Sequence, residues 1–188
     1  MPMAHPGPAD NSLMPVTQRP SPAVAPIVSP GAPDETLQLC AFDDHLHRQQ
    51  VIALWREVFG YEAAHNTPAL AIDKKLAVAD GLFFVALRGG AVVGTTLAGY
   101  DGHRGWLYSV AVYPLQRQRG VGSALVAHAE RALVARGCLK INLQIVATNE
   151  SIARFYQSLG YAVEPRISMG KVVHGYATSV PQGTLGLN

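Results

Sequence analysis

The sequence is poor in several features that particular classes of protein require. Charged residues make up only 15% of its 188 residues, and the formal net charge is +2. That balance is too weak for an electrostatic footprint on nucleic acid or on an anionic membrane. No run approaches the roughly 18 apolar residues that cross a bilayer. Prolines also interrupt the N-terminus where a secretory signal would have its apolar centre. We therefore expect a cytoplasmic protein that binds neither nucleic acid nor a membrane.

Cysteine is equally scarce. The chain has two, Cys40 and Cys138, far apart and without the spacing of zinc ligands. This excludes a disulfide framework and a structural zinc site, and we expect two reduced, buried thiols. His45 and His47 are close in sequence, but positions two apart on a helix diverge by about 200°, so they do not converge on one ion. No metal site is predicted.

Proline is concentrated at one end of the chain. Nine of the 13 prolines fall within the first 33 residues, a stretch that has few amide donors and no apolar periodicity. The composition predicts a disordered, proline-rich arm over residues 1–35, a folded domain over residues 36–173 and a loose tail over residues 174–188.

The apolar pattern of the central part alternates between the periods of strands and helices. Strands are expected over residues 36–42, 82–87, 91–99, 106–113, 140–147, 161–163 and 167–173. Helices are expected from Asp43 or Asp44 to Gly60 and over residues 68–79, 120–136 and 151–159. Tight turns make most neighbouring strands antiparallel, whereas the strand–helix–strand passage from 106 to 147 requires a parallel crossover. The fold predicted is α/β, with a mixed, mostly antiparallel sheet of about six to seven strands flanked by about four helices.

The last of these helices carries an apolar stripe. Ile152, Phe155 and Leu159 fall on one side of the helix, and we expect that side to face the core. Tyr156 is turned by about 100° from Phe155 and borders the stripe. This position predicts a partly buried ring with a hydroxyl that can reach a ligand.

A candidate anion site lies between the strand that ends at Pro114 and the helix that starts near Gly120. Its sequence, residues 117–122, is Arg-Gln-Arg-Gly-Val-Gly. A helix start presents unpaired amide N–H groups and the positive end of the helix dipole. The arginines add charge, and Gly120 and Gly122 remove side chains that would hold a phosphate at a distance. A plain strand-to-helix turn with solvated arginines remains the alternative reading.

The same segment carries a resemblance to a known family. Arg117-x-x-Gly120-x-Gly122 resembles the Gln/Arg-x-x-Gly-x-Gly/Ala motif of the GCN5-related N-acetyltransferase (GNAT) family. Residues 108–114 resemble the fourth strand of that family, and residues 149–161 resemble its second signature. The resemblance covers about residues 36–173, and residues 100–105 are further similar to the YpeA-type bacterial members.

The resemblance implies a transferase that moves an acetyl group from acetyl-coenzyme A to a primary amine by direct attack. The acceptor would be a small molecule or a peptide. In that family the backbone of Val110, Ala111 and Val112 would pair with the pantetheine arm, Asn149 would contact it, and Tyr156 would protonate the leaving thiolate. The pyrophosphate site would be formed by the motif and the residue after it: Arg117, Gln118, Arg119, Gly120, Val121, Gly122 and Ser123.

One departure from the family leaves the general base open. Many members place a glutamate on the fourth strand, whereas residues 106–112 contain no carboxylate. The candidates are Glu57, Asp101, His103, Glu150 and an ordered water. The missing glutamate also keeps a second function open, in which the chain is a non-catalytic, acyl-coenzyme A-binding regulatory or interaction module of the same fold.

Overall fold

The computed structural model describes residues 36–60, 67–171 and 173. The predicted arm, residues 1–35, and the predicted tail, residues 174–188, lie outside this part of the chain. The described elements follow the predicted order. They are β1 (Gln38–Ala41), α1 (Asp44–Phe59), α2 (Pro68–Val78), β2 (Phe83–Arg88), β3 (Ala91–Tyr100), β4 (Gly105–Val112), a 3-10 turn (Pro114–Gln116), α3 (Val121–Val134), β5 (Ile141–Leu143) and α4 (Glu150–Ser158). None of these helices is long and apolar enough to cross a membrane.

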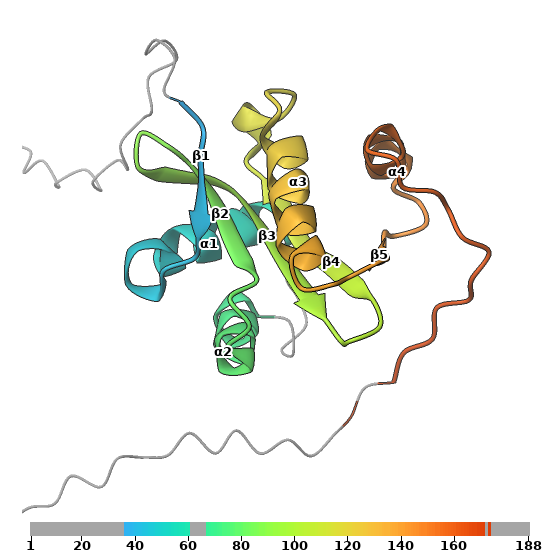
Figure 1. Ribbon diagram of the computed structural model, residues 1–188. Helices are drawn as coiled ribbons and strands as arrows, with labels where there is room; N and C mark the ends of the chain where they lie inside the picture. Colours follow the sequence, from blue (N-terminus) through green and yellow to red (C-terminus); the bar gives the residue numbers. More distant parts are fainter. Residues whose placement is uncertain (1–35, 61–66, 172, 174–188) are drawn as a thin grey trace, which may run out of the picture. The chain divides into compact units, whose positions relative to one another are not determined.

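The described strands form one sheet in the order β1-β2-β3-β4-β5 (Figure 1). The first four are antiparallel neighbours, and β4 and β5 are parallel. The mixed α/β fold with a single parallel crossover is therefore confirmed. The crossover passes through α3, as a strand–helix–strand connection requires.

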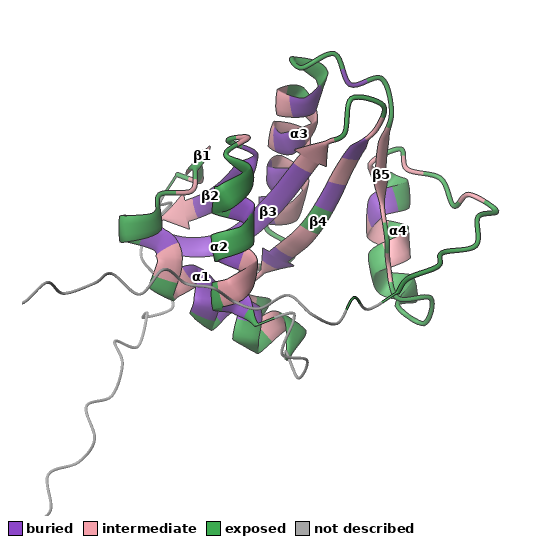
Figure 2. Cartoon of the chain, turned by 90° about the horizontal axis from the view of Figure 1, so that it is seen from below, coloured by how far each residue is buried: buried purple, intermediate pink, exposed green. Residues whose placement is uncertain are grey.

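Helices cover both faces of the sheet. In Figure 2, α3 lies on one face, α1 and α2 lie on the other, and α4 stands beside β5. Successive side chains of β2 point to opposite faces of the sheet, so each face has its own hydrophobic core. Phe83 packs with Trp55 of α1 on one face, and Phe84 packs with Val126 and Leu133 of α3 on the other.

The bounds of helix α1 are set by a capping residue at each end. The Asp43 carboxylate accepts hydrogen bonds from the amides of His45 and Leu46, both at 2.9 Å. Gly60 closes the helix in the left-handed conformation, with φ +56°. Its apolar residues, spaced three to four positions apart, face the sheet, and Val51, Leu54 and Trp55 are completely buried.

The prediction of six to seven strands was wrong, since the described part of the chain has five. The segment after α4, expected to form strands at 161–163 and 167–173, carries no strand among its described residues. Its ties to the region of β5 are between side chains, Lys140 with Glu164 and Gln144 with Ser168. Pro165 removes an amide from the segment, and Ile167 is 92% exposed, so neither a backbone ladder nor a buried face supports a strand.

Candidate active site

The parallel pair of strands separates soon after it begins. Gly105–Leu107 of β4 pairs with Ile141–Leu143 of β5, where β5 ends, while β4 continues to Val112. Beyond Leu107 no described strand pairs with this edge of β4. Its backbone groups are therefore available to an extended ligand that would lie where the neighbouring strand is missing.

A β-bulge lies where the two strands part. In the register of β3 with β4, Thr95 pairs with Ala111 and Leu97 pairs with Tyr108, so Ser109 and Val110 together oppose one residue of β3. Ser109 has φ +49°, a left-handed conformation that is uncommon for a residue other than glycine. The bulge bends β4 at the start of its open edge.

The turn after β4 leads to an uncapped helix N-terminus. Gln118 and Gly120 are both left-handed, with φ +59° and +77°, and no described side chain caps α3. The amide of Ala124 is bonded to the Gly120 carbonyl, so the amides of the preceding first-turn residues lack an acceptor within the helix. The first turn contains no acidic residue. An anion would meet free N–H donors and the positive end of the dipole.

The arginines of this turn differ in their contacts. Both Arg117 and Arg119 are exposed. The Nε of Arg117 donates to the Val112 carbonyl at 3.3 Å, which ties the turn to the end of β4. This contact gives Arg117 a role in shaping the turn in addition to its charge.

Gly122 serves a purpose that the sequence did not indicate. A Cβ built at this position would lie 3.2 Å from Cζ of Phe155 and 3.8 Å from Cγ2 of Val112. The missing side chain makes room for the Phe155 ring of α4, so Gly122 brings the two signature segments into contact. At Gly120 the reason for glycine is different. Open space surrounds that position, so a side chain would fit, but the left-handed backbone favours a residue without a Cβ.

Helix α4 faces the core with two of the three predicted residues, because Phe155 and Leu159 are half-buried against it, but Ile152 does not join them. Tyr156 is only 7% exposed, whereas Ile152 is 39% exposed. Since no described strand extends the sheet beyond β5, the part of α4 that carries Ile152 has no sheet to cover. Tyr156 instead packs in the core shared with Leu107 and Val126.

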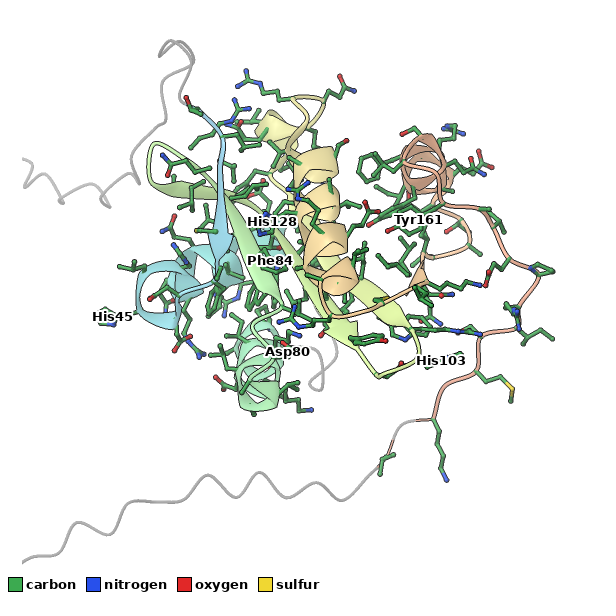
Figure 3. All side chains as sticks on the ribbon, in the orientation of Figure 1. His45, Asp80, Phe84, His103, His128 and Tyr161 are labelled. Carbon is green, nitrogen blue, oxygen red and sulfur yellow. The ribbon has the colours of Figure 1, made fainter. Side chains whose placement is uncertain are left out.

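The surroundings of Tyr156 keep its hydroxyl protonated. Burial raises the pKa of Tyr156 to about 12. Its ring lies edge-on to Phe155 and Tyr161, with centroid separations of 5.0 and 5.6 Å. The Tyr161 hydroxyl donates to Oε1 of Glu130 at 2.7 Å, which fixes Tyr161 between α3 and α4 (Figure 3). No described residue forms a hydrogen bond with the Tyr156 hydroxyl, which leaves its proton for a ligand.

Asn149 lies at the other end of α4 and caps it. Its Oδ1 accepts from the amide of Ile152 at 3.3 Å and from the Ser151 hydroxyl at 3.0 Å. The NH₂ group of Asn149 is the part of this side chain that could still bind a ligand.

A shallow hollow of about 510 Å³ lies on the α2 side of the sheet, at the start of β4. It is lined by Val78, Asp80, Gly99, Tyr100, Asp101, Trp106 and Tyr108. The Asp80 carboxylate is paired with the buried ammonium of Lys75 at 2.7 Å, and that ammonium lies 5.6 Å from the centre of the Tyr108 ring. Figure 3 shows Asp80 where α2 ends. Nothing in the sequence pattern indicates the Lys75–Asp80 pair, because a lysine on a helix ordinarily points into solvent.

Of the four side chains considered as general bases, Asp101 alone lines this hollow. Hydrogen bonds from the amides of Arg104 and His103 lower the pKa of Asp101, so its carboxylate is ionised at neutral pH. His103 lies at the exposed tip of the β3–β4 hairpin (Figure 3). Glu150 pairs with Arg154, and Glu57 lies near the ring of Tyr113 at the far end of β4.

The histidines near the start of α1 do not converge. His45 is exposed and points away from the fold in Figure 3, whereas His47 is buried and its Nδ1 accepts from the Asp43 amide at 2.9 Å. Within the described residues no three histidine, cysteine or acidic side chains are grouped as metal ligands.

Comparison with known proteins adds independent evidence. The model of the "Acetyltransferase (GNAT) family" matches residues 48–161. An acetyltransferase of Yersinia enterocolitica is 39% identical over 123 residues, which cover 65% of this chain and 86% of that protein. An acetyltransferase of Sodalis glossinidius is 40% identical over 119 residues, covering 63% and 83%. The solved structure of aminoglycoside N-acetyltransferase AAC(6')-Iy in complex with CoA has the same fold, with a TM-score of 0.62 at 22% identity over 77% of this chain and 99% of that one.

Proposed function

This chain belongs to the acetyltransferase (GNAT) family, and we propose that it transfers an acetyl group from acetyl-coenzyme A to a primary amine by direct attack. The observation that carries the proposal is the open edge of β4, which leads through one short turn to the uncapped N-terminus of α3. Acetyl-coenzyme A has a matching layout, with an amide-bearing pantetheine arm joined to a pyrophosphate.

The residues present fit this co-substrate. The free amides at the start of α3, from Arg119 to Ser123, would hold the pyrophosphate. The open edge at Val110–Val112 would pair with the amides of the arm, as an added strand does, and the NH₂ group of Asn149 would reach it from α4. When bound, acetyl-coenzyme A supplies an activated thioester, and the protein supplies its position.

Tyr156 would act as the general acid. Attack by the amine breaks the carbon–sulfur bond and leaves negative charge on the sulfur, which gains from a nearby hydrogen-bond donor. Tyr156 is supported in this role by its raised pKa and by a hydroxyl that is not bonded to any described residue. The proton would pass from the Tyr156 hydroxyl to the departing thiolate.

The acceptor would approach through the hollow beside Tyr108. Its amine must be neutral to attack, so a proton has to leave. Asp101 is the candidate base that lines this hollow, and an ordered water is the alternative carrier. A covalent acyl-enzyme has no support, because burial raises the pKa of Cys40 and Cys138 is buried with its thiol directed to the Lys140 carbonyl.

A thiol-release assay with acetyl-coenzyme A and a panel of amines tests the proposal. The panel should include small polyamines, amino acids, aminoglycosides and lysine-bearing peptides, because the acceptor class is open. Amine-dependent release of free coenzyme A supports an enzyme. Binding of acetyl-coenzyme A without release for any amine would instead favour the non-catalytic regulatory module.

A further inference from the structure

We propose that Trp55 and Thr95 are positioning residues for acyl transfer, because they hold the bulge of β4 in the conformation that the reaction uses. The inference rests on the function proposed above. Trp55 Nε1 donates to the Thr95 hydroxyl at 2.8 Å, and that hydroxyl donates to the Ser109 carbonyl at 3.1 Å. The two hydrogen bonds form a relay from α1 through β3 to the bulge.

The relay has a fixed direction. An indole N–H can only donate, and a hydroxyl has a single hydrogen to give. Because Trp55 supplies the hydrogen of the first bond, the hydrogen of Thr95 is free for the Ser109 carbonyl. Trp55 and Thr95 are both completely buried, so water does not replace either partner.

The Trp55 ring is itself held in place. It stacks on Phe83 at a centroid separation of 5.7 Å and an interplanar angle of 17°, and Phe83 stacks on Phe42 at 4.1 Å and 3°. The donor at the head of the relay therefore has a defined position within the α1 core.

The relay also sets the direction of the next backbone amide, the N–H of Val110. Ser109 has the left-handed conformation, which costs energy unless its surroundings favour it. A trans peptide is planar, with its C=O and N–H pointing in opposite directions. With the Ser109 carbonyl turned toward the Thr95 hydroxyl, the N–H of Val110 points away from that hydroxyl, so that it would face the open edge of β4. There it would donate to the thioester oxygen as negative charge develops on it.

Two neighbouring threonines supply a matched test. Thr95→Val removes the hydroxyl of the relay with little change of shape. Thr96→Val makes the same change at the adjacent residue, which is also completely buried but whose hydroxyl has no hydrogen-bond partner among the described residues. We expect Thr95→Val to lower kcat for acetyl transfer by about 10- to 100-fold, with the KM for acetyl-coenzyme A kept within about threefold. Thr96→Val should retain the kcat of the wild type.

Two further variants separate positioning from general stability. Thr95→Ser keeps a hydroxyl and should restore most of kcat, while Trp55→Phe keeps an aromatic ring, removes the donor and should lower kcat less than Thr95→Val. Equal kcat values for Thr95→Val and Thr96→Val would overturn the proposal. So would a failure of Thr95→Ser to exceed Thr95→Val.

A readout without turnover distinguishes this inference from the proposed function. The amide resonance of Val110, followed by NMR in the ligand-free protein, should shift in Thr95→Val and remain nearly unchanged in Thr96→Val. If the wild type releases no thiol with any amine but the resonance shifts as expected, the proposed function fails and the relay stands. If the resonance does not move in Thr95→Val, the relay is refuted whatever the activity.

Discussion

The two halves of the candidate site are built from different parts of the polypeptide. On the side of α3, the groups available to a ligand are backbone amides and carbonyls, set by the open edge of β4 and the uncapped helix start. On the side of α2, the groups are side chains, with carboxylates and aromatic rings around a hollow. A backbone site tolerates changes of sequence and suits a donor shared across a family. A side-chain site can differ in each member and suits the choice of acceptor.

The largest expected effect is the loss of donor binding in Gly120→Glu. Ligand at 100 times its dissociation constant should stabilise the wild type by about 2.7 kcal/mol. Open space surrounds a Cβ at this position, so the glutamate would meet no clash, but its charge would oppose the pyrophosphate at the free amides. We expect the ligand-induced shift in Tm to disappear.

Gly120→Ala is the control for that variant. It introduces the same strain at φ +77°, about 1–2 kcal/mol, without the charge. Its unliganded Tm should fall as in Gly120→Glu, but acetyl-coenzyme A should still raise it. A ligand-induced shift of normal size in Gly120→Glu would show that the pyrophosphate does not bind at this helix start.

The second-largest effect is expected at Tyr156, the proposed general acid, which lies beside the backbone half of the site. Tyr156→Phe keeps the ring and removes the proton, so kcat should fall on the order of 10²-fold while the affinity for acetyl-coenzyme A is nearly kept. Single-turnover thiol release and equilibrium binding measure the two quantities. A kcat equal to that of the wild type would exclude the hydroxyl as the acid.

The same variant should change stability at alkaline pH. The pKa of Tyr156 is raised to about 12 in the folded protein, above its ordinary value of about 10. The folded state thus binds this proton more tightly than the unfolded state, and the stability it confers is complete below pH 10 and declines as the pH rises toward 12. Tyr156→Phe should reduce the alkaline loss of stability, as measured by denaturant unfolding between pH 9 and 11. A pH profile identical to that of the wild type would contradict the raised pKa.

A similar contrast separates the structural features that the sequence predicts from those that it does not. The helices, the sheet with its single crossover and the glycine-containing turn before α3 follow from local patterns, because caps, periodicity and glycine positions act over a few residues. The bulge at Ser109 does not, since no residue there favours a left-handed backbone and the hydrogen bond that supports it comes from Thr95, 14 positions away. The Lys75–Asp80 pair and the exposure of Ile152 on α4 likewise depend on which distant residues pack against each side chain.

A smaller effect is expected on the α2 side of the site, where we propose that the acceptor binds. The variant Asp101→Asn tests it. An amide oxygen can still accept from the backbone of His103 and Arg104, so the turn should persist, but the negative charge is lost. We expect the KM for the amine to rise about tenfold, the value of one charge-assisted hydrogen bond, with the KM for acetyl-coenzyme A unchanged. A fall in kcat in the same variant would identify Asp101, rather than an ordered water, as the base. Asp44→Asn, which removes an exposed carboxylate paired with Arg48 on α1, should leave both KM values as in the wild type. An unchanged amine KM in Asp101→Asn would show that the acceptor does not use this side of the hollow.

The smallest effect is expected at His103, two residues further along the same turn. At about 3.3 Å per residue, His103 is far from the middle of β4. Its side chain is exposed, and its backbone amide donates to the Asp101 carboxylate. His103 is not among the side chains that line the hollow. His103→Ala should therefore keep the amine KM of the wild type, even though the adjacent Asp101→Asn raises it. If the KM rises in His103→Ala as well, the hairpin folds over the acceptor when it binds, and the side-chain half of the site is larger than the hollow.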